Sequence, residues 1–273
     1  MKRLITNIQN AVEQVGGTWG IALKDLDTQE TWDLNGDELF YAASVIKVPI
    51  MAAVFNAFDK GEFTLSDTII LKREDLVGGA GILQFMTPGA SFTIHDIMTL
   101  MIIQSDNTAT NMLIDLVGIA NIQKTMKDIG LKRSSFYNKL MTVPVHIDGK
   151  NLITAGEMAT LLEKIACGKV VSVYACEQMI DIMKKQQIRD CLPGKLPYNE
   201  SAIIGVNPEW ELANKTGWVS GCRHDIGIFY VGKRKMICAV LSKDVDDGKS
   251  LQVLAEIGKL IYDYMNLPPL SDC

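Results

Sequence analysis

Apolar residues along the chain repeat at two different spacings, and the change between them marks the secondary structure. Residues 1–15 carry apolar side chains three and four apart, which predicts an amphipathic helix. Residues 18–25 alternate apolar and polar side chains, and residues 31–34 continue the alternation beyond a turn. The chain is therefore expected to begin with a helix and a β-hairpin.

The middle of the chain, residues 39–200, has almost no strand signal apart from a short extended piece at residues 65–71. Helical spacing dominates there and predicts a run of helices, at residues 94–103, 108–117, 121–129 and from Thr154 onward. Alternation returns beyond Gly205 and predicts three successive strands and a last helix, at residues 211–219, 225–231, 235–242 and 251–264.

Strands thus lie at both ends of the chain, and helices lie between them. The simplest arrangement is an α+β fold, in which both ends build one antiparallel sheet flanked by helices and a helical domain is inserted. Residues 1–38 and 203–273 are expected to form the α/β domain, and residues 39–202 the inserted all-α domain. An active site is expected at the interface of the two.

The composition is that of an ordinary globular protein, with 273 residues, 48% hydrophobic, 22% charged and a formal net charge of -5. A nucleic-acid partner is not expected, because no basic footprint is present. We also expect no membrane partner, because no run of about 18 apolar residues occurs. The first 15 residues lack the apolar core of a signal peptide. We therefore expect a cytoplasmic monomer, secreted only if a leader was removed.

The six cysteines lack the Cys-x-x-Cys spacing of metal sites and redox motifs. Carboxylates do not cluster with His or Cys at the spacing of metal ligands either. We therefore expect free thiols and no metal or other cofactor.

The stretch of residues 42–50 holds the first candidate for chemistry. Ser44 and Lys47 are three residues apart, so on a helix their side chains share one face, with Cβ atoms roughly 5 to 6 Å apart. A desolvated lysine near a second cation can be the base that activates a serine nucleophile. About one Ser-x-x-Lys is expected by chance in a chain of this length, so the motif needs further support.

Two further short motifs follow in order along the chain, Ser105-Asp106-Asn107 and Lys215-Thr216-Gly217. Taken alone, the first is more often a helix cap or turn and the second the end of a strand. By composition each occurs in only about a few chains per hundred. The three motifs together, in this order, favour a catalytic site.

With these motifs the chain resembles the class A serine β-lactamases and the related penicillin-recognising D,D-peptidases. The resemblance covers nearly the whole chain, with further similar blocks at residues 77–83, 88–89, 93–101, 105–109 and 154–159. It implies the fold expected above and an enzyme that opens a cyclic amide through an acyl-serine intermediate.

The resemblance implies a catalytic role for four residues. Ser44 is the expected acylated nucleophile, and Lys47 is its proton acceptor. Ser105 is expected to pass a proton to the leaving nitrogen. Lys215 is expected to attract a substrate carboxylate and, as a second cation, to lower the pKa of Lys47.

The resemblance also implies a substrate-binding set, which comprises Asn107, Asn138, Thr216, Gly217, Trp218, Arg223 and His224. Asn107 is expected to bind a side-chain amide of the substrate, and Thr216 its carboxylate. Either Arg223 or His224, on the following strand, is expected to help hold that carboxylate. The backbone N–H groups of Ser44 and Trp218 are expected to form the oxyanion hole.

The chain departs from the family pattern in the loop of residues 136–151. Hydrolytic class A members carry a Glu there that activates the deacylating water, and an alignment without gaps places Asn138 at that position. Phe136 and Asn151 replace the Arg and Asp that clamp the loop. An amide cannot accept a proton at neutral pH. Acylation is therefore expected to survive, deacylation to be slow or altered, and the loop to be more mobile than average.

Asp148, Glu157 or His146 can replace the missing Glu only if the loop folds differently. His146 is more simply a solvated loop residue, and His95 is expected on a helix surface. Three functions stay open. The leading one is a β-lactamase with slow or altered deacylation. The others are a D,D-peptidase, esterase or amidase, and a penicillin-binding protein that stays acylated. Each has a small-molecule partner, a β-lactam or an acyl-peptide or ester.

Overall fold

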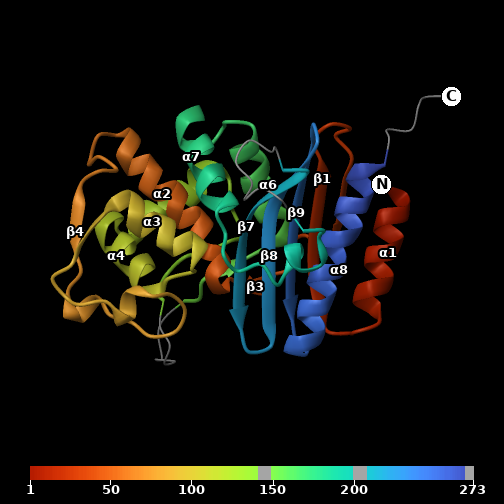
Figure 1. Ribbon diagram of the computed structural model, residues 1–273, viewed down its shortest axis with the longest axis horizontal. Coiled ribbons are helices and arrows are strands. Elements are labelled where there is room, and N and C mark those ends of the chain that lie inside the picture. Colours follow the sequence, from red (N-terminus) through yellow and green to blue (C-terminus); the bar gives the residue numbers. More distant parts are fainter. Residues whose placement is uncertain (141–148, 199–207, 268–273) are drawn as a thin grey trace.

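The computed structural model describes residues 1–140, 149–198 and 208–267. The N-terminal part forms α1 (Lys2–Glu13), β1 (Thr18–Asp25) and β2 (Thr31–Leu34). The C-terminal part forms β7 (Trp210–Val219), β8 (Cys222–Val231), β9 (Arg234–Lys243) and α8 (Asp247–Asn266). The five strands pair antiparallel in the order β2-β1-β9-β8-β7 (Figure 1). Both chain ends therefore share one sheet, and β7 lies at its edge.

Helices cover both faces of this sheet. α1 and α8 pack on one face, where Ile8 is fully buried (Figure 1). The other face meets α6 (Ala155–Ala166) and α7 (Val173–Lys184), which come from the middle of the chain. Each face of the sheet has its own hydrophobic core, and strand side chains alternate between them. Val240 of β9 faces the core under α1 and α8, and the neighbouring Ala239 faces the core under α6 and α7.

The middle of the chain is mainly helical. Its elements before α6 are β3 (Phe40–Tyr41), the 3-10 turn η1 (Ala43–Ile46), α2 (Lys47–Asp59), β4 (Thr68–Ile70), η2 (Arg73–Asp75), η3 (Leu83–Phe85), β5 (Ser91–Thr93), α3 (Ile94–Ile103), α4 (Asn107–Val117), α5 (Ile119–Ile129) and β6 (Leu152–Ile153). A further 3-10 turn, η4 (Leu192–Lys195), follows α7. α2 is buried on almost every side because α3, α4, α5 and α7 contact it. Its N-terminal end meets the sheet, where η1 contacts β7 and β8.

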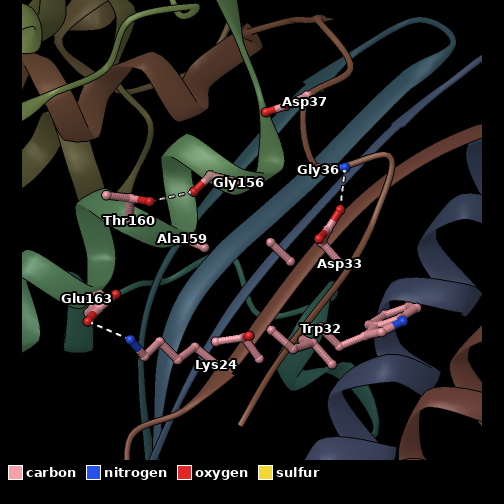
Figure 2. A pocket seen from close by; sticks show the side chains of 12 residues that line it. Lys24, Trp32, Asp33, Gly36, Asp37, Gly156, Ala159, Thr160 and Glu163 are labelled. Atoms are coloured by element: carbon pink, nitrogen blue, oxygen red, sulfur yellow. Dashed lines mark hydrogen bonds and ion pairs between the residues drawn. The ribbon is translucent and has the colours of Figure 1, made fainter. Parts of the chain in front are cut away.

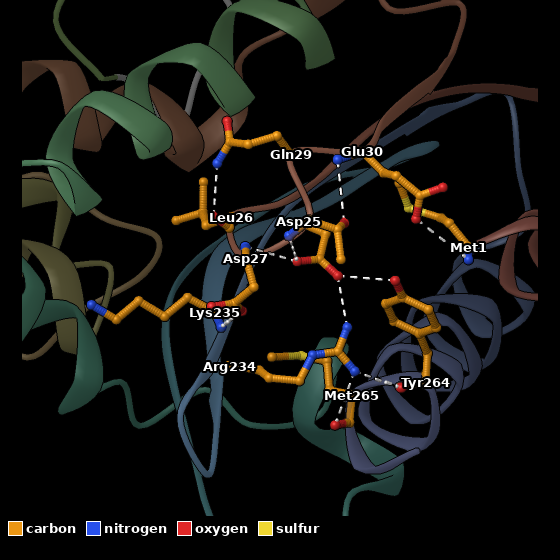
Figure 3. A network of polar contacts seen from close by, with 11 residues as sticks. Met1, Asp25, Leu26, Asp27, Gln29, Glu30, Arg234, Lys235, Tyr264 and Met265 are labelled. Carbon is orange, nitrogen blue, oxygen red and sulfur yellow. Dashed lines mark hydrogen bonds and ion pairs between the residues drawn. The ribbon is translucent and has the colours of Figure 1, made fainter. Parts of the chain in front are cut away.

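A buried carboxylate ties the two ends of the chain together (Figure 3). One oxygen of Asp25 accepts hydrogen bonds from Arg234 at 2.7 Å and from the hydroxyl of Tyr264 at 2.9 Å. The other accepts the backbone N–H groups of Asp27 and Thr28. Burial raises the pKa of Asp25, but these hydrogen bonds outweigh burial and hold the pKa below its usual value. The network fastens β1, β9 and α8 at one point.

α6 meets the N-terminal hairpin on the opposite face of the sheet (Figure 2). Lys24 pairs with Glu163 at 2.7 Å, and the N–H of Gly156 donates to Gly36 O at 2.9 Å. A Cβ on Gly156 would lie 3.1 Å from that oxygen, so the close approach favours glycine. These residues border a hollow of about 300 Å³ between β1, β2 and α6.

The predicted α+β fold, with a sheet drawn from both chain ends, is confirmed. β8 begins at Cys222 rather than at residue 225, because pairing with β7 continues to a two-residue turn after Val219. The predicted extended piece is a three-residue strand, β4. The five cysteines among the described residues are free thiols, as expected.

The boundaries of the two domains stay a prediction, and residue 203 lies outside the described residues. His95 lies on α3 with its side chain 38% exposed, as expected for a helix surface. In the described part of the chain, no helix has both the length and the apolar character needed to cross a bilayer.

Candidate active site

Ser44 and Lys47 lie where the chain turns into α2. Ser44 belongs to η1, and Lys47 is the first residue of α2. Residues three apart in a 3-10 turn lie above each other, and Lys47 Nζ is 3.0 Å from Ser44 Oγ. Ala43 has a φ of 43°, in the left-handed region that residues with a Cβ rarely adopt. This strained step sets Ser44 at the helix start, where backbone N–H groups have no helical acceptor.

Oxygen atoms surround the amine of Lys47, which is fully buried. Nζ lies 2.5 Å from Ser105 O, 2.9 Å from Asn107 Oδ1, 3.1 Å from Ser105 Oγ and 3.0 Å from Ser44 Oγ. The two carbonyl oxygens can only accept, so they take two N–H groups. A neutral amine then has its lone pair left for a hydroxyl proton. The geometry suits a neutral lysine that accepts the proton of Ser44.

Burial and charge both favour the neutral form of Lys47. Burial lowers the pKa of Lys47 well below its usual range, and the positive charge of Lys215 lowers it further. The carboxylate of Asp106 acts in the opposite direction with a smaller effect. Lys47 is therefore a base in a position where an exposed lysine would be a cation.

Ser105 links the two lysines. Its Oγ lies 3.1 Å from Lys47 Nζ and 3.0 Å from Lys215 Nζ, and Lys215 also donates to Thr216 O at 2.7 Å. Ser105 has a φ of 52°, a second strained position within the site. Lys215 is fully buried, and burial lowers its pKa to about 7. A continuous path of polar contacts thus runs from Ser44 to Lys215.

Asp106 holds the glycine-rich segment against the site. As the N-cap of α4 it accepts the N–H of Ala109, and its second oxygen accepts those of Ile82 and Leu83. Gly81 has a φ of 104°, and a Cβ there would lie 2.2 Å from Asp106 Cγ. The segment approaches so closely only because this residue is glycine.

Asn107 connects the same segment to Lys47. Its Oδ1 accepts from Lys47, while its Nδ2 donates to Gly78 O at 3.1 Å. Its backbone N–H donates to Ala80 O at 3.0 Å. Asn107 therefore positions the base, and its contact with a substrate amide stays a prediction.

β7 passes directly beside Ser44. A Cβ on Gly217 would lie 3.2 Å from Ser44 N and 3.1 Å from Val45 N, so glycine permits this approach of the edge strand. Trp218 follows, with 59% of its surface exposed. The backbone N–H groups of Ser44 and Trp218 thus come from two adjoining segments. This is the arrangement an oxyanion hole requires, and the role itself stays a prediction.

Thr216 and Arg223 lie near each other at the sheet edge. Alternate residues of a strand share a face, so Thr216 and Trp218 lie on one side of β7, and Arg223 pairs with Trp218 in the β7–β8 register. The guanidinium of Arg223 lies over the Trp218 ring at 5.3 Å. Its buried Nε has no hydrogen-bond partner among the described residues.

His224 does not belong in the substrate-binding set, contrary to the prediction. It is fully buried, and its Nδ1 accepts the N–H of Ser242 at 3.1 Å. Nε2 therefore carries the proton and donates to Tyr41 O at 2.8 Å. Burial lowers the pKa of His224 to about 4, so the ring is neutral. Both nitrogens are occupied by backbone groups, and the residue joins β8 to β9 and β3.

Amide groups hold the base of the loop in which the family Glu is missing. Asn151 Oδ1 accepts the N–H groups of Tyr137 at 2.8 Å and Asn138 at 3.1 Å, and Asn151 Nδ2 donates to Asn138 O at 2.8 Å. Asn138 Nδ2 donates to Gly149 O at 3.0 Å. An uncharged clamp thus stands in place of an ion pair. Residues 141–148 lie outside the described part of the chain, and the mobility of the loop stays a prediction.

Two loop residues contact α4: the side chain of Lys139 pairs with Asp115, and the backbone of Leu140, two positions after Asn138, is bound by Asn111. Asn111 Nδ2 donates to Leu140 O, and Leu140 N donates to Asn111 Oδ1, each at 2.9 Å. Asn111 lies one helical turn after Asn107, about 6 Å along the axis. The structure therefore ties Leu140, rather than Asn138, to the helix that begins at the site. An alignment without gaps gave no sign of this contact.

Glu157 cannot replace the missing Glu in this fold. Its carboxylate accepts the backbone N–H groups of Lys132, Arg133 and Ser134 at 2.6, 2.7 and 2.7 Å. These bonds fix the chain ahead of the loop, and they occupy the oxygens that would have to bind water. The other two alternatives, His146 and Asp148, lie outside the described residues.

The fold and the contacts around Ser44 define a class: a serine hydrolase of the penicillin-recognising type, with a lysine beside the serine at a helix start. Comparison with known proteins agrees. The model of the β-lactamase enzyme family matches residues 3–265. The chain belongs to this family, among the class A serine β-lactamases.

Similar proteins cover most of the chain. The β-lactamase AER-1 of Aeromonas hydrophila is 24% identical over 96% of this chain and 85% of its own length. The β-lactamase of Rhodobacter capsulatus is 31% identical, but the match covers 43% of this chain and 40% of that protein.

Solved structures show the same fold. A β-lactamase from Sphaerobacter thermophilus DSM 20745 superposes with a TM-score of 0.88 at 29% identity, covering 97% of this chain and 98% of its own. PBP-A superposes with a TM-score of 0.83 at 28% identity, covering 97% of this chain and 96% of its own. A leucine-to-glutamate mutant of PBP-A, solved as an acyl-enzyme complex with penicillin G, has the same score and identity.

Proposed function

We propose that this protein opens β-lactam rings through an acyl-Ser44 intermediate and releases the acyl group slowly. The observation that carries the proposal is the path of contacts from Ser44 Oγ through Lys47 and Ser105 to Lys215, with steps of 3.0, 3.1 and 3.0 Å. Membership of the β-lactamase family supports it.

The path accounts for every proton in the acylation step. Ser44 Oγ attacks the lactam carbonyl carbon while Lys47 takes the hydroxyl proton. The C–O bond forms, and the oxyanion accepts the N–H groups of Ser44 and Trp218. The C–N bond then breaks, and the nitrogen takes a proton from Ser105, which regains one from Lys47. The proton lost by Ser44 therefore ends on the ring nitrogen.

The far end of the path suits a substrate with a carboxylate beside the scissile amide. Lys215 offers a buried positive charge when protonated, and Thr216 offers a hydroxyl beside it. The guanidinium of Arg223, on the same face of the sheet as Thr216 and Trp218, adds a further positive charge at this edge. Penicillins and acyl-peptides ending in a free carboxylate both meet this requirement.

Slow release is expected because the described residues of the loop supply no free carboxylate or histidine. Hydrolysis of an acyl-serine needs a base that activates water. Leu140 and Asn138 carry no base, and Glu157 is occupied by backbone N–H groups. The acyl-enzyme reported for the PBP-A mutant supports acylation by penicillin G in this fold.

Mapping the covalent label tests the nucleophile. After incubation with benzylpenicillin and proteolysis, mass spectrometry should find one penicilloyl group, on the peptide that contains Ser44. The Ser44→Ala variant should carry none, while Ser66→Ala, at an exposed serine outside the described site, should label like the parent protein. Equal labelling of Ser44→Ala, or a label on another peptide, would refute the assignment.

A second candidate function is a D,D-peptidase or esterase, and the absence of a carboxylate at Leu140 and Asn138 favours it. Such an enzyme should hydrolyse a thioester that mimics an acyl-D-Ala substrate faster than it turns over benzylpenicillin. Multiple turnover of penicillin with no reaction of the thioester would exclude this candidate.

A further inference from the structure

A buried carboxylate beneath the edge of the sheet has no part in the mechanism above. Asp225 lies on β8, is fully buried, and pairs with Thr216 in the β7–β8 register. Asn214 Nδ2 donates to its two oxygens at 2.9 and 3.1 Å, and the N–H of Leu192 donates to it at 3.0 Å. Asn214 directly precedes Lys215. The carboxylate is therefore fastened to the stretch of β7 that carries this lysine.

Two glycines let the surrounding elements close on this carboxylate. Gly227 pairs with Asn214 across the strands, and a Cβ on it would lie 2.9 Å from Asn214 Cβ. On the other side, α8 places Gly258 against Leu192, where a Cβ would lie 1.8 Å from Leu192 O. A side chain at either position would displace one of the two donors to Asp225.

The charged and titratable groups around Asp225 come from three strands and the segment before η4. They are Lys215 from β7, Arg223 from β8, Cys238 from β9, and Asp190 and Cys191 ahead of η4. Lys215 is the fully buried cation of this set. Burial raises the pKa of Asp225 and lowers that of Lys215, and the attraction between the two charges opposes both shifts.

The charge on Lys215 matters because a second lysine shares its contact. Nζ of Lys47 and Nζ of Lys215 both lie within 3.1 Å of Ser105 Oγ. Two ammonium groups at one hydroxyl repel, so a proton on one lysine disfavours a proton on the other. Asp225 is an anion near Lys215, and its negative charge favours the state in which Lys215 carries the proton.

We propose that Asp225 is a positioning residue that decides which of the two lysines carries the proton. It holds Lys215 as the cation that attracts the substrate carboxylate, and so it leaves Lys47 as the neutral base. Asp225 acts through Lys215 and does not touch the substrate. The inference rests on the proposed acylation of Ser44.

The isosteric variant Asp225→Asn removes the charge and keeps the shape. Acylation of Ser44 by benzylpenicillin is measured by quenched-flow mass spectrometry across the pH range of the reaction. Without the anion, Lys215 loses its proton at lower pH, and Lys47, relieved of repulsion, keeps its proton to higher pH. The alkaline limb of the pH profile should therefore move toward acid by about one unit, with an about tenfold loss of rate on that limb. The acid limb should move less, because burial raises the pKa of Asp225 to about 7 and the parent carboxylate already loses its charge there. Asp190→Asn, an exposed neighbour, should leave the window unchanged.

A folded Asp225→Asn protein whose two pH limbs match the parent protein would overturn the proposal, even if its melting temperature falls. If that variant does not fold, Asn214→Ala serves instead, because it removes the two hydrogen bonds from Asn214 that lower the pKa of Asp225 and so reduces the share of molecules in which Asp225 is an anion, while the bond from Leu192 N–H remains. It should move the alkaline limb in the same direction by less than Asp225→Asn does, and an unchanged limb would again reject the proposal. Failure of the parent protein to form any adduct would instead refute the proposed function.

Discussion

At the scale of single residues, the chemistry of the site comes from burying two lysines around one serine. In water both amines would be cations. Here both are fully buried, and each lies near Ser105 Oγ. The desolvation that lowers both pKa values also strengthens the repulsion between them. This repulsion favours a pair in which one amine is neutral and the other is a cation.

The pH dependence of acylation should report this cation. Lys215, with a pKa of about 7, attracts a substrate carboxylate only while it is protonated. The acylation rate of benzylpenicillin should therefore be retained below this pKa and fall as the pH rises through it. The methyl ester of the same penicillin has no carboxylate, so its slower acylation should lack this decline. The same decline for both compounds would show that Lys215 is not its cause.

The clustering of the candidate catalytic residues could be predicted from the sequence because they lie in short motifs with helical or strand spacing. Ser44 and Lys47 share a face of one turn, and the structure brings them together with Ser105 and Lys215. His224 was misassigned because its partners, Ser242 and Tyr41, come from segments far from it in the sequence, which only the folded chain brings beside β8. Asp225 was not recognised at all for the same reason.

At the scale of elements, the proposed slow release of the acyl group is a prediction about the loop after α5. Asn111 fixes Leu140 to α4, and Asn151 fixes Asn138 at the base of the loop. The first contact places Leu140 beside the helix that starts at Asn107. A carboxylate at that point of the loop should reach the site, whereas one two residues earlier should point toward the loop base.

A matched pair of variants tests this placement. Leu140→Glu should speed hydrolysis of the acyl-enzyme by about tenfold or more, because it supplies a general base. Asn138→Glu should leave the rate near that of the parent protein. The loss of mass of the penicilloyl adduct over time measures both rates. Faster release by Asn138→Glu but not by Leu140→Glu would contradict this placement and would support the alignment without gaps, which puts Asn138 at the position of the family Glu.

Glu157 should act as a structural anchor for the segment ahead of the loop. Glu157→Gln weakens three charge-assisted hydrogen bonds to backbone N–H groups and should lower the free energy of unfolding by about 1 to 3 kcal/mol. Glu163→Gln, which breaks the partly exposed pair with Lys24, should cost less. Urea unfolding of both variants gives the comparison, and equal losses would contradict the anchoring role.

Helices and strands were predicted well because their apolar spacing is strong, as in α1, β1 and α3. What the sequence concealed were contacts made by side-chain amides. Asn111 and Asn151 look like ordinary polar residues in sequence. In the structure, Asn151 binds the loop at Tyr137 and Asn111 binds it at Leu140. An amide clamp has no periodic signal, so only the folded chain reveals it.

At the scale of the whole molecule, the sheet depends on joining two ends of the chain that lie more than 200 residues apart. Asp25 of β1 meets Arg234 of β9 and Tyr264 of α8, with sequence separations of 209 and 239 residues. β7, which borders the site, is the edge of this same sheet. The position of Gly217 beside Ser44 therefore depends on the closure of the sheet as a whole.

The Asp25 network should make stability depend on pH. The pKa of Asp25 is lower in the folded protein than in the unfolded chain. Its contribution to the free energy of unfolding is therefore fully present above the unfolded pKa, about 4, and is lost as the pH falls through the folded pKa. Asp25→Asn should lower the melting temperature at neutral pH and less so in acid. Asp263→Asn, on the exposed face of α8, is the control. An equal effect of Asp25→Asn at both pH values would contradict this account.

The measurement that tests the central claim most directly is the intact mass of the protein over time after mixing with a small excess of benzylpenicillin. The account predicts rapid gain of one penicilloyl group and a mass that stays shifted for long after the antibiotic is added, because Lys47 serves acylation and no described loop side chain serves release. A mass that returns quickly to its starting value while the penicillin is consumed over many turnovers would contradict it.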